Sequence, residues 1–292
     1  MTGVALLLVL GSAVCHASWN FLLKRSDHKI AFLGSAGIVA ALTLLLPATS
    51  VVAVNGIGRS AVALGCVTAC LHGIYGLSLA RGYQLGDLSS VYPVSRGVGL
   101  ALIPLGAALL LDESISGWAV LGIAMIAVGV YALHVEPETW RDVAAPLRAL
   151  NGPAGRAALL TGVLIAIYSL WDKNALDELS PVVLNQFAMT GHALITTTVA
   201  IALVRSADDL RSEWRSRPGS IIAAGVLIQL AYLLVLAALE TSRVSYVAPS
   251  REVGIVFGAA LGVVFLGEGF GLWRIWASLA IVAGVIVLAV AP

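Results

Sequence analysis

Charged and aromatic side chains recur inside the apolar stretches of this chain. His16, Asn20 and Lys24 follow one another at intervals of four residues in the first stretch, with Trp19 beside them. This spacing places the three polar side chains on one face of a helix. Because polar groups are costly in apolar surroundings, each is a candidate for function. The alternatives are hydrogen bonding between helices for His16 and Asn20, and a helix-end position for Lys24.

Two arginines each follow a proline inside an apolar stretch. Arg96 belongs to the run GDLSSVYPVSRG, and Arg251 belongs to the run SRVSYVAPSREVG. An arginine within a membrane must find a partner or face water, and its forked donors suit a carboxylate or a phosphonate. Glu252 is the candidate for a group that binds and releases a coupling proton. Its alternative role is a static ion pair with Arg96 or Lys24.

Further polar and aromatic residues lie at comparable places in other apolar stretches. Tyr168 and Asp172 are four residues apart, so they share a helix face, and they occupy the places that His16 and Asn20 have in the first stretch. Aromatic side chains beside a few charges suit a small amphipathic or ionised solute. The residues predicted to line a solute site near the midplane are His16, Trp19, Asn20, His72, Tyr75, Tyr92, Arg96, Tyr168, Trp171, Asp172, Gln229, Tyr232 and Arg251, with Glu252 as the proton-coupling candidate.

The composition indicates which elements must position these side chains. The chain has 292 residues, of which 59% are hydrophobic and 11% are charged. A soluble domain has roughly 25% charged residues. Lipid can solvate this much apolar surface, and a helix needs roughly 20 apolar residues to cross it. We therefore expect an all-α polytopic membrane protein with ten transmembrane helices, near residues 2–23, 29–54, 60–83, 89–111, 115–134, 154–173, 181–204, 219–240, 244–266 and 270–290.

The first apolar stretch could be mistaken for a secretory signal peptide. It lacks the positively charged start that such a signal needs and continues beyond Trp19 to Leu23, so we expect it to remain as the first membrane helix. Cys15, Cys66 and Cys70 all lie within apolar stretches. Three cysteines placed in this way cannot form an extracellular disulfide framework.

The two halves of the chain resemble each other in sequence. Five residues recur at one constant offset: Arg96, Gly99, Glu113, Trp118 and Gly129 are matched by Arg251, Gly254, Glu268, Trp273 and Gly284. The pairs Trp19–Asn20 and His72–Tyr75 are matched by Trp171–Asp172 and Gln229–Tyr232. Five spans per repeat force the second copy to enter from the opposite side, so the repeats are inverted around a central cavity. The predicted units are a first repeat at 1–134, a polar linker at 135–152 and a second repeat at 153–292.

Two of the matched residues are expected to have structural roles. Glu113 and Glu268 stand where a long span meets a short turn, and each is predicted to favour the N-terminus of the next helix. Orientation follows from the lysines and arginines, which are concentrated in the loops after the first, third, fifth and seventh spans. The positive-inside rule places those loops in the cytoplasm and both termini outside.

Four runs carry a resemblance to a known family: HASWNFLLKRSDHK, GDLSSVYPVSRG, LDESISGWAVLGIAMIAVGVYAL and VAPSREVGIVFGAALGVVFLGE. Over nearly the whole chain they resemble the EamA-type, ten-span branch of the drug/metabolite transporter superfamily. Within it they are most similar to the HAxWN-type members, some of which lie near phosphonate-catabolism genes. The resemblance implies a multi-pass inner-membrane permease with a central cavity lined by its first, third, fourth, sixth, eighth and ninth helices.

The resemblance also implies export of amino acids, metabolites or drugs, driven by protons or by exchange. Members of the branch usually carry their positive loops on the side of the termini, whereas the count here is the opposite, which leaves import or export open. The predicted function is secondary transport by alternating access of small polar or amphipathic metabolites. Export of amino-acid-like, anionic or zwitterionic solutes is the favoured form.

Two alternatives come from other functional classes. An intramembrane enzyme is disfavoured, because the sequence has no HExxH motif, no cluster of aspartates on one face and no nucleophile with an obvious histidine partner. A flippase for a lipid-linked intermediate would need a lateral opening between helices. No P-loop is present, so ATP does not drive transport directly. We expect a solute and the bilayer as partners, no cofactor, metal or nucleic acid, and leave a homodimer open.

Overall fold

The computed structural model describes residues 1–85, 88–134, 151–203, 207–266 and 271–292. Within these ranges all regular structure is helical, as the predicted fold class requires. Seven helical stretches there are long and apolar enough to cross a membrane, and Val94–Leu110 and Gly117–Leu133 are shorter apolar helices. The structure thus confirms an all-α polytopic membrane protein, while the number of ten spans stays a prediction.

Helices occupy every segment predicted as a span. In the first half they are α1 (Gly3–Lys24), α2 (Lys29–Thr43), α3 (Leu45–Asn55), α4 (Arg59–Leu85), α5 (Leu88–Leu110) and α6 (Gly117–His134). In the second half they are α9 (Pro153–Ala175), α10 (Pro181–Leu203), α12 (Pro218–Thr241), α13 (Val244–Ser250), α14 (Val253–Leu266) and α15 (Leu272–Val290). A short polar helix, α11 (Ala207–Ser216), was not predicted. Most of the predicted polar linker, at 135–150, lies outside the described residues.

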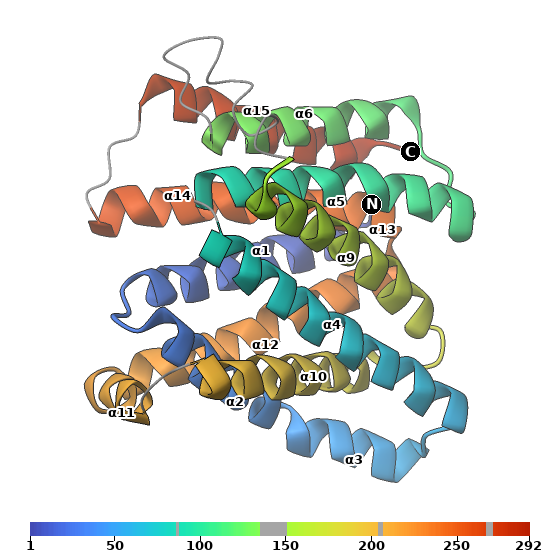
Figure 1. Cartoon of the computed structure of the whole chain (residues 1–292). Coiled ribbons are helices and arrows are strands. Elements are labelled where there is room, and N and C mark those ends of the chain that lie inside the picture. Colours follow the sequence, from blue (N-terminus) through green and yellow to red (C-terminus); the bar gives the residue numbers. More distant parts are fainter. Residues whose placement is uncertain (86–87, 135–150, 204–206, 267–270) are drawn as a thin grey trace.

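The helices lie in layers, with α6 and α15 on one side of the bundle and α2, α3 and α10 on the other (Figure 1). Between them, α1 packs along α12, and α9 packs along both α4 and α5. Both termini are at the same end: the amide of Thr2 donates to Ser242 Oγ at 3.5 Å, and the hydroxyl of Tyr246 donates to the carbonyl of Pro292 at 2.6 Å. The loops rich in lysine and arginine follow the odd-numbered predicted spans, so they belong to the opposite end of the bundle from the termini.

Glycines bring α6 and α15 into close contact. A Cβ on Gly122 would lie 2.8 Å from the carbonyl oxygen of Gly284, and a Cβ on Gly284 would lie 2.6 Å from that of Gly122. At the next contact, a Cβ on Gly129 would lie 2.7 Å from the oxygen of Ala277. In lipid, such close packing is what holds helices together, because burial of apolar surface gives no advantage there. The pair α6 and α15 forms one side of the bundle. The polar side chains of the candidate site lie on the helices of the middle layer instead.

The helix that carries Arg251 is broken. It includes Pro249, which lacks a backbone N–H. The amide of Arg251 still reaches back four residues to Val247 O at 3.3 Å, but those of Glu252 and Gly254 reach back only three, to Pro249 O at 3.1 Å and Arg251 O at 3.0 Å. Irregular backbone at this depth is tolerated only where protein or a cavity surrounds it. The break therefore places Arg251 and Glu252 inside the bundle, between α13 and α14.

Glu113 caps a different helix from the one predicted. Its Oε1 accepts from the amide of Val244 at 2.8 Å, and its Oε2 accepts from the amide and the hydroxyl of Ser245 at 3.0 and 2.5 Å. The carboxylate thus stabilises the N-terminus of α13 in the other half of the chain, while Ser116 caps the following helix, α6. The matched residue, Glu268, lies outside the described residues.

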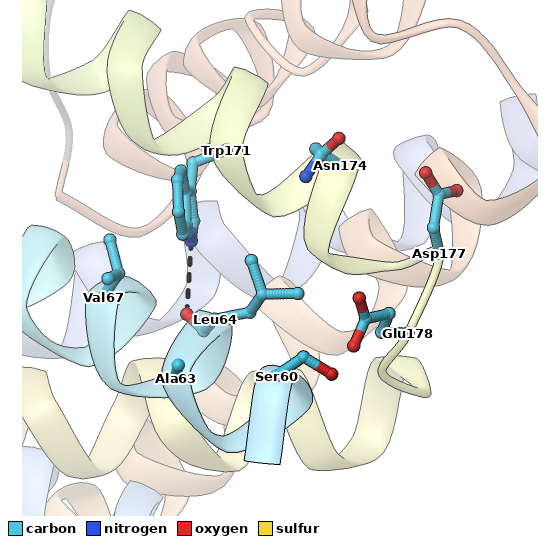
Figure 2. Close-up of a pocket in the computed structure, with 8 residues that line it drawn as sticks. All are labelled: Ser60, Ala63, Leu64, Val67, Trp171, Asn174, Asp177 and Glu178. Carbon is cyan, nitrogen blue, oxygen red and sulfur yellow. Dashed lines mark hydrogen bonds between the residues drawn. The ribbon is translucent and has the colours of Figure 1, made fainter. Parts of the chain in front are cut away.

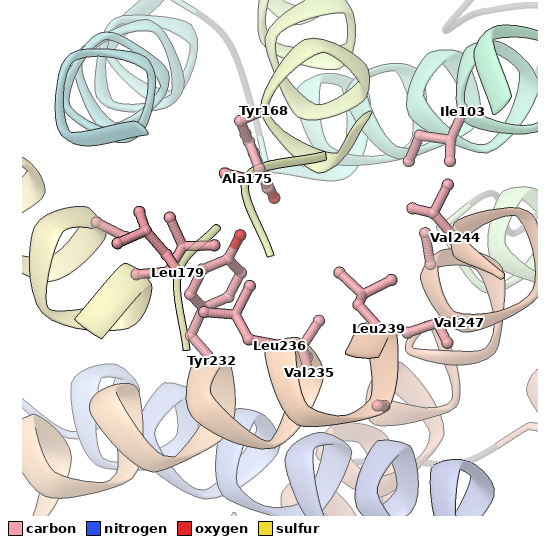
Figure 3. Packing of buried hydrophobic residues seen from close by; sticks show 14 of the residues in the cluster. Ile103, Tyr168, Ala175, Leu179, Tyr232, Val235, Leu236, Leu239, Val244 and Val247 are labelled. Carbon is pink, nitrogen blue, oxygen red and sulfur yellow. The ribbon is translucent and has the colours of Figure 1, made fainter. Parts of the chain in front are cut away.

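The largest buried apolar cluster lies where α9, α12 and α13 approach each other (Figure 3). Leu236 and Leu239 of α12 meet Val244 and Val247 of α13 in this cluster, and Tyr168 of α9 lies close by. The cluster fixes these three helices relative to one another at the end of the bundle that holds the termini. It is the scaffold on which the buried polar groups stand.

Candidate solute site and gate

Asp172 is the centre of a buried hydrogen-bonded group, which we call the Asp172 cluster: Thr68, His72, Asp172 and Tyr232. The Thr68 hydroxyl donates to Oδ1 of the carboxylate at 2.7 Å, and His72 Nε2 lies 2.8 Å from Oδ2. The Tyr232 hydroxyl also donates to Oδ2. Asp172 is 0% exposed, so these donors take the place of water. The cluster ties α4, α9 and α12 together at one point.

Aromatic rings surround the Asp172 cluster on its inner side. The ring of Tyr168 lies 4.4 Å from that of His72, 5.3 Å from that of Tyr75 and 6.4 Å from that of Tyr232, measured between centroids. Edge-on and tilted contacts of this kind are favourable for aromatic pairs. The rings therefore form a packed wall between the Asp172 cluster and the arginines.

Arg96 and Glu252 form an ion pair in the interior. Arg96 Nη1 lies 3.2 Å from Glu252 Oε1, and their side chains are 12% and 7% exposed. The guanidinium also lies over the ring of Tyr92, with 5.1 Å from Cζ to the centroid. Of the two partners considered for Glu252, the structure thus provides Arg96. Whether this pair exchanges a proton stays a prediction.

Arg251 differs from Arg96 in its partners. Its Cζ lies 5.8 Å from the centroid of the Tyr232 ring, whose hydroxyl donates to Asp172. In the part of the chain that the structure describes, no carboxylate lies within ion-pair distance of Arg251. The interior around the helix break therefore carries two guanidinium groups and one paired carboxylate.

A narrow cavity of about 10 Å³ lies between these charges, which is room for about one water molecule. It is lined by Arg96, Gly99, Leu100, Ile103, Ile165, Ser169, Ala248, Arg251 and Glu252. Ser169 is only 3% exposed, and its hydroxyl has no hydrogen-bond partner in the structure. This hydroxyl can therefore donate to a molecule that enters the cavity.

The polar residues of α1 lie near the arginines but are more open. His16 is close enough to Arg96 and Arg251 for both charges to act on it. Trp19 Nε1 donates to His16 Nδ1 at 3.3 Å, and the ring packs in an apolar cluster with α2 and α12. Asn20 is exposed, and its amide turns back to donate to the carbonyl of His16 at 2.7 Å.

Two predicted lining residues lie apart from this group. Gln229 is 1% exposed, and neither polar atom of its side chain has a partner. Trp171 donates to the carbonyl of Leu64 at 3.2 Å and lines a groove of about 400 Å³ between the ends of α4 and α9 (Figure 2). Asp177 and Glu178 stand at the same groove.

The structure therefore gathers most, not all, of the predicted residues. Those that meet in the interior are His16, His72, Tyr75, Tyr92, Arg96, Tyr168, Asp172, Tyr232, Arg251 and Glu252. Thr68 and Ser169 were missed. Thr68 precedes His72 by four residues and so shares its helix face, a signal that spacing alone contained. Ser169 had no such signal, because an isolated serine in an apolar helix usually bonds to its own backbone.

Apolar helices around buried charges, with one helix broken at an arginine, are the architecture of a membrane transporter. Residues 156–290, slightly less than half of the chain, match the model of the EamA-like transporter family. Together with the apolar helices, this match supports a multi-pass integral membrane transporter of that type. The closer resemblance to HAxWN-type members stays a prediction.

A comparison with solved structures shows that this fold occurs in another protein. A structure described only as "Crystal structure of protein" superimposes with a TM-score of 0.76 and 16% sequence identity, over 98% of this chain and 96% of the other. At this identity the likeness concerns the fold alone. A search of curated proteins found no match.

Proposed function

We propose that this transporter carries small solutes with an anionic group, including zwitterionic amino-acid-like solutes, by alternating access. The observation that carries the proposal is the guanidinium of Arg251, which stands in the interior without a carboxylate partner among the described residues. A buried charge is costly unless it is paired, so a solute carboxylate or phosphonate would offset this cost. The forked donors of arginine suit both groups.

The walls of the site suit the remainder of such a solute. Tyr75, Tyr92 and Tyr168 lie near the arginines and can present aromatic faces to a solute. An ammonium group can bind to such a face. This favours a zwitterion or a small apolar anion over a sugar, which would need many hydrogen-bond partners.

Alternating access is supported by the difference between the two ends of the bundle. At the end with the termini, α9 contacts both α4 and α12, and the Asp172 cluster closes the space between them. At the other end, α1 packs along α12 but makes at most marginal contact with α4 in the described residues. Two inverted repeats, at 1–134 and 153–292 with a polar linker at 135–152, would supply one gate each.

The direction of transport would depend on which end admits the solute. The loops rich in lysine and arginine follow odd-numbered predicted spans, and the positive-inside rule places them in the cytoplasm. With the Asp172 cluster closed, solute would enter from that side, and opening of the cluster would release it outside. The protein is then an exporter in the inner membrane.

Proton coupling would act through Glu252. A proton on this carboxylate removes the charge that holds Arg96, and the released guanidinium then joins Arg251 in binding the anionic group. Solute and proton would thus favour each other's binding, which is the thermodynamic condition for coupling. Exchange of two solutes without a proton is the alternative form of the same cycle.

The test is transport by purified protein in liposomes that contain a pH-sensitive dye. Amino acids, organic acids, phosphonates and cationic drugs are added in turn to wild type, Glu252→Gln, Arg96→Ala and Arg251→Ala. We expect proton flux that depends on an anionic or zwitterionic solute, lost in Glu252→Gln and strongly reduced in Arg251→Ala. Isotope flux without proton movement, intact in Glu252→Gln, would make the protein an exchanger or facilitator. Transport of cationic drugs alone would contradict the anionic substrate class.

A flippase for a lipid-linked intermediate is less well supported. Such a function would need a lateral opening between helices, whereas the groove of Figure 2 lies at the ends of α4 and α9, where Asp177 and Glu178 stand. Exposed carboxylates repel the phosphate groups of lipid-linked intermediates. If the folded protein transports none of the solutes tested, this alternative would nevertheless be favoured.

A further inference from the structure

We propose that the site, while Glu252 is charged, selects solutes whose binding group carries one negative charge over those with two, and that Glu252 sets this preference. The inference rests on the proposed function, because it specifies the substrate class of the same site. Monocarboxylates and amino acids with neutral side chains are then substrates. Dicarboxylates of the same size are poor ones.

The first step is the sum of charges at the cavity. Arg96, Arg251 and Glu252 are the charged residues among those that line it. Because Arg96 and Glu252 are paired at 3.2 Å, the positive charge that remains belongs to Arg251. One negative charge on a solute balances it. A second would stand in the interior without a partner, which is unfavourable in surroundings of low dielectric constant.

The second step is that the neighbouring charged residues of α9 do not add to the charge of the cavity. Asp172 is bound to its own three donors behind the ring of Tyr232. Lys173, the next residue along α9, directs its ammonium to the carbonyls of Leu239 and Ser242 at 2.5 and 3.2 Å. Neither group is therefore available to balance a second negative charge on the solute.

The third step is a second donor for the anionic group. The Ser169 hydroxyl is buried, has no partner and lines the cavity together with Arg251. The two donors come from different elements, α9 and the break between α13 and α14, so a carboxylate bound to both would link these elements. The cavity has room for about one water as it stands. Entry of a carboxylate therefore requires these elements to separate, as alternating access demands.

The probes are succinamate and succinate, which share a carbon skeleton and differ by one negative charge. Their binding to the full-length protein in detergent is measured by the shift in melting temperature as a function of concentration. For wild type we expect succinamate to bind at least about tenfold more tightly than succinate. Glu252→Gln should raise the charge of the site by one and remove or reverse this preference.

Charge rescue separates this role from a structural one. The double variant Arg96→Gln with Glu252→Gln restores the single positive charge without restoring the ion pair, so the preference for succinamate should return. Ser169→Ala should weaken both probes by at least about tenfold and leave their ratio unchanged, because each loses one hydrogen bond to a charged carboxylate. Ser278→Ala is the matched control, since that hydroxyl is also buried without a partner but belongs to α15. It should change neither value.

Three results would overturn the inference: wild type binds succinate more tightly, the ratio is unchanged in Glu252→Gln, or neither probe binds wild type at tens of millimolar. A preference that is lost in Glu252→Gln and stays lost in the double variant would show that the ion pair, not the charge, matters. The proposed function fails separately, by the absence of solute flux in liposomes. Flux of anions of either charge, independent of Glu252 and Ser169, would preserve the transporter and reject the selection rule.

Discussion

The ends of α9 and α1 occupy matched places in the two halves of the chain, yet they differ in charge and in closure. At the end of α9, Asp172 is completely buried and binds donors from α4 and α12. At the end of α1, Asn20 is exposed and bonds only within its own helix among the described residues. The carboxylate of Asp172 thus connects three helices through the bonds that it accepts. The amide of Asn20, at the matched place, connects none among the described residues.

The donors available to the two ends are also matched but used differently. Tyr232 reaches Asp172, whereas its counterpart Tyr75 packs against Tyr168. The counterpart of His72 is Gln229, whose buried amide has no partner. The comparison suggests that the state described here is one of two. In the other, Tyr75 and Gln229 would approach Asn20 while the Asp172 cluster opens.

Asp172→Ala should have the largest effect on the difference between the two ends. It leaves the buried His72 and the hydroxyls of Thr68 and Tyr232 without their acceptor. We expect a loss of about 3–5 kcal/mol in the free energy of unfolding, as for other broken buried pairs. Thermal unfolding in detergent measures this. The matched control, Asn20→Ala, removes an exposed amide and should cost less than about 0.5 kcal/mol. Equal losses in the two variants would reject the difference between the ends.

Asp172→Asn should make the two ends alike. The amide keeps the shape of the carboxylate but has one acceptor oxygen in place of two and no charge, so it cannot accept from Thr68 as well as from His72 and Tyr232. We expect the closed end to be weakened by about 1.4 kcal/mol or more. Closure at the other end should then become about tenfold more frequent. The measurement is disulfide formation between Asn20→Cys and Tyr75→Cys.

The cross-link needs a background without the native cysteines. Cys15, Cys66 and Cys70 are therefore replaced by serine, and the rate is compared with and without Asp172→Asn. A disulfide requires Cα atoms within about 7 Å, so it forms only when α1 and α4 approach. An unchanged rate in Asp172→Asn would mean that the two ends do not alternate.

Glu113→Ala tests the support of the closed end from the other half of the chain. It removes the cap of α13 and leaves the amides of Val244 and Ser245 without an acceptor. We expect a loss of about 1–2 kcal/mol in the free energy of unfolding, the upper range for helix caps. Ser116→Ala removes the single bond at the start of α6 and should cost less. The reverse order in thermal unfolding would contradict the assigned cap.

The sequence predicted the faces of single helices better than the contacts between helices. Spacing of four residues correctly placed Tyr168 and Asp172 on one face, whereas Trp171, one position from Asp172, points about 100° away and so lines the outer groove. Local sequence contains no information on which distant backbone a side chain will reach. The bond of Glu113 to α13 and that of Thr68 to Asp172 each span over a hundred residues, so they could not be predicted.

Burial is the other property that the sequence could not supply. Ser169 and Ser278 are chemically identical residues in apolar helices, and only the structure separates the one that lines a cavity with two arginines from the one buried in α15. The same holds for the arginines. Their motifs are matched in the two halves, yet Arg96 has Glu252 as a partner and Arg251 does not.

Lys173→Met should have the smallest effect on the difference between the two ends. Lys173 links α9 to the end of α12 through two carbonyls, and its counterpart in α1 is Phe21, which packs against Phe265. Because Lys173 is partly exposed, we expect the loss of its bonds to weaken the closed end by only about 1 kcal/mol. The Asn20→Cys and Tyr75→Cys cross-link should therefore form about fivefold faster. Phe21→Met, which has no such bonds to lose, should leave the rate unchanged, and equal acceleration by both variants would mean that general loosening of the bundle, not the lysine, controls the gate.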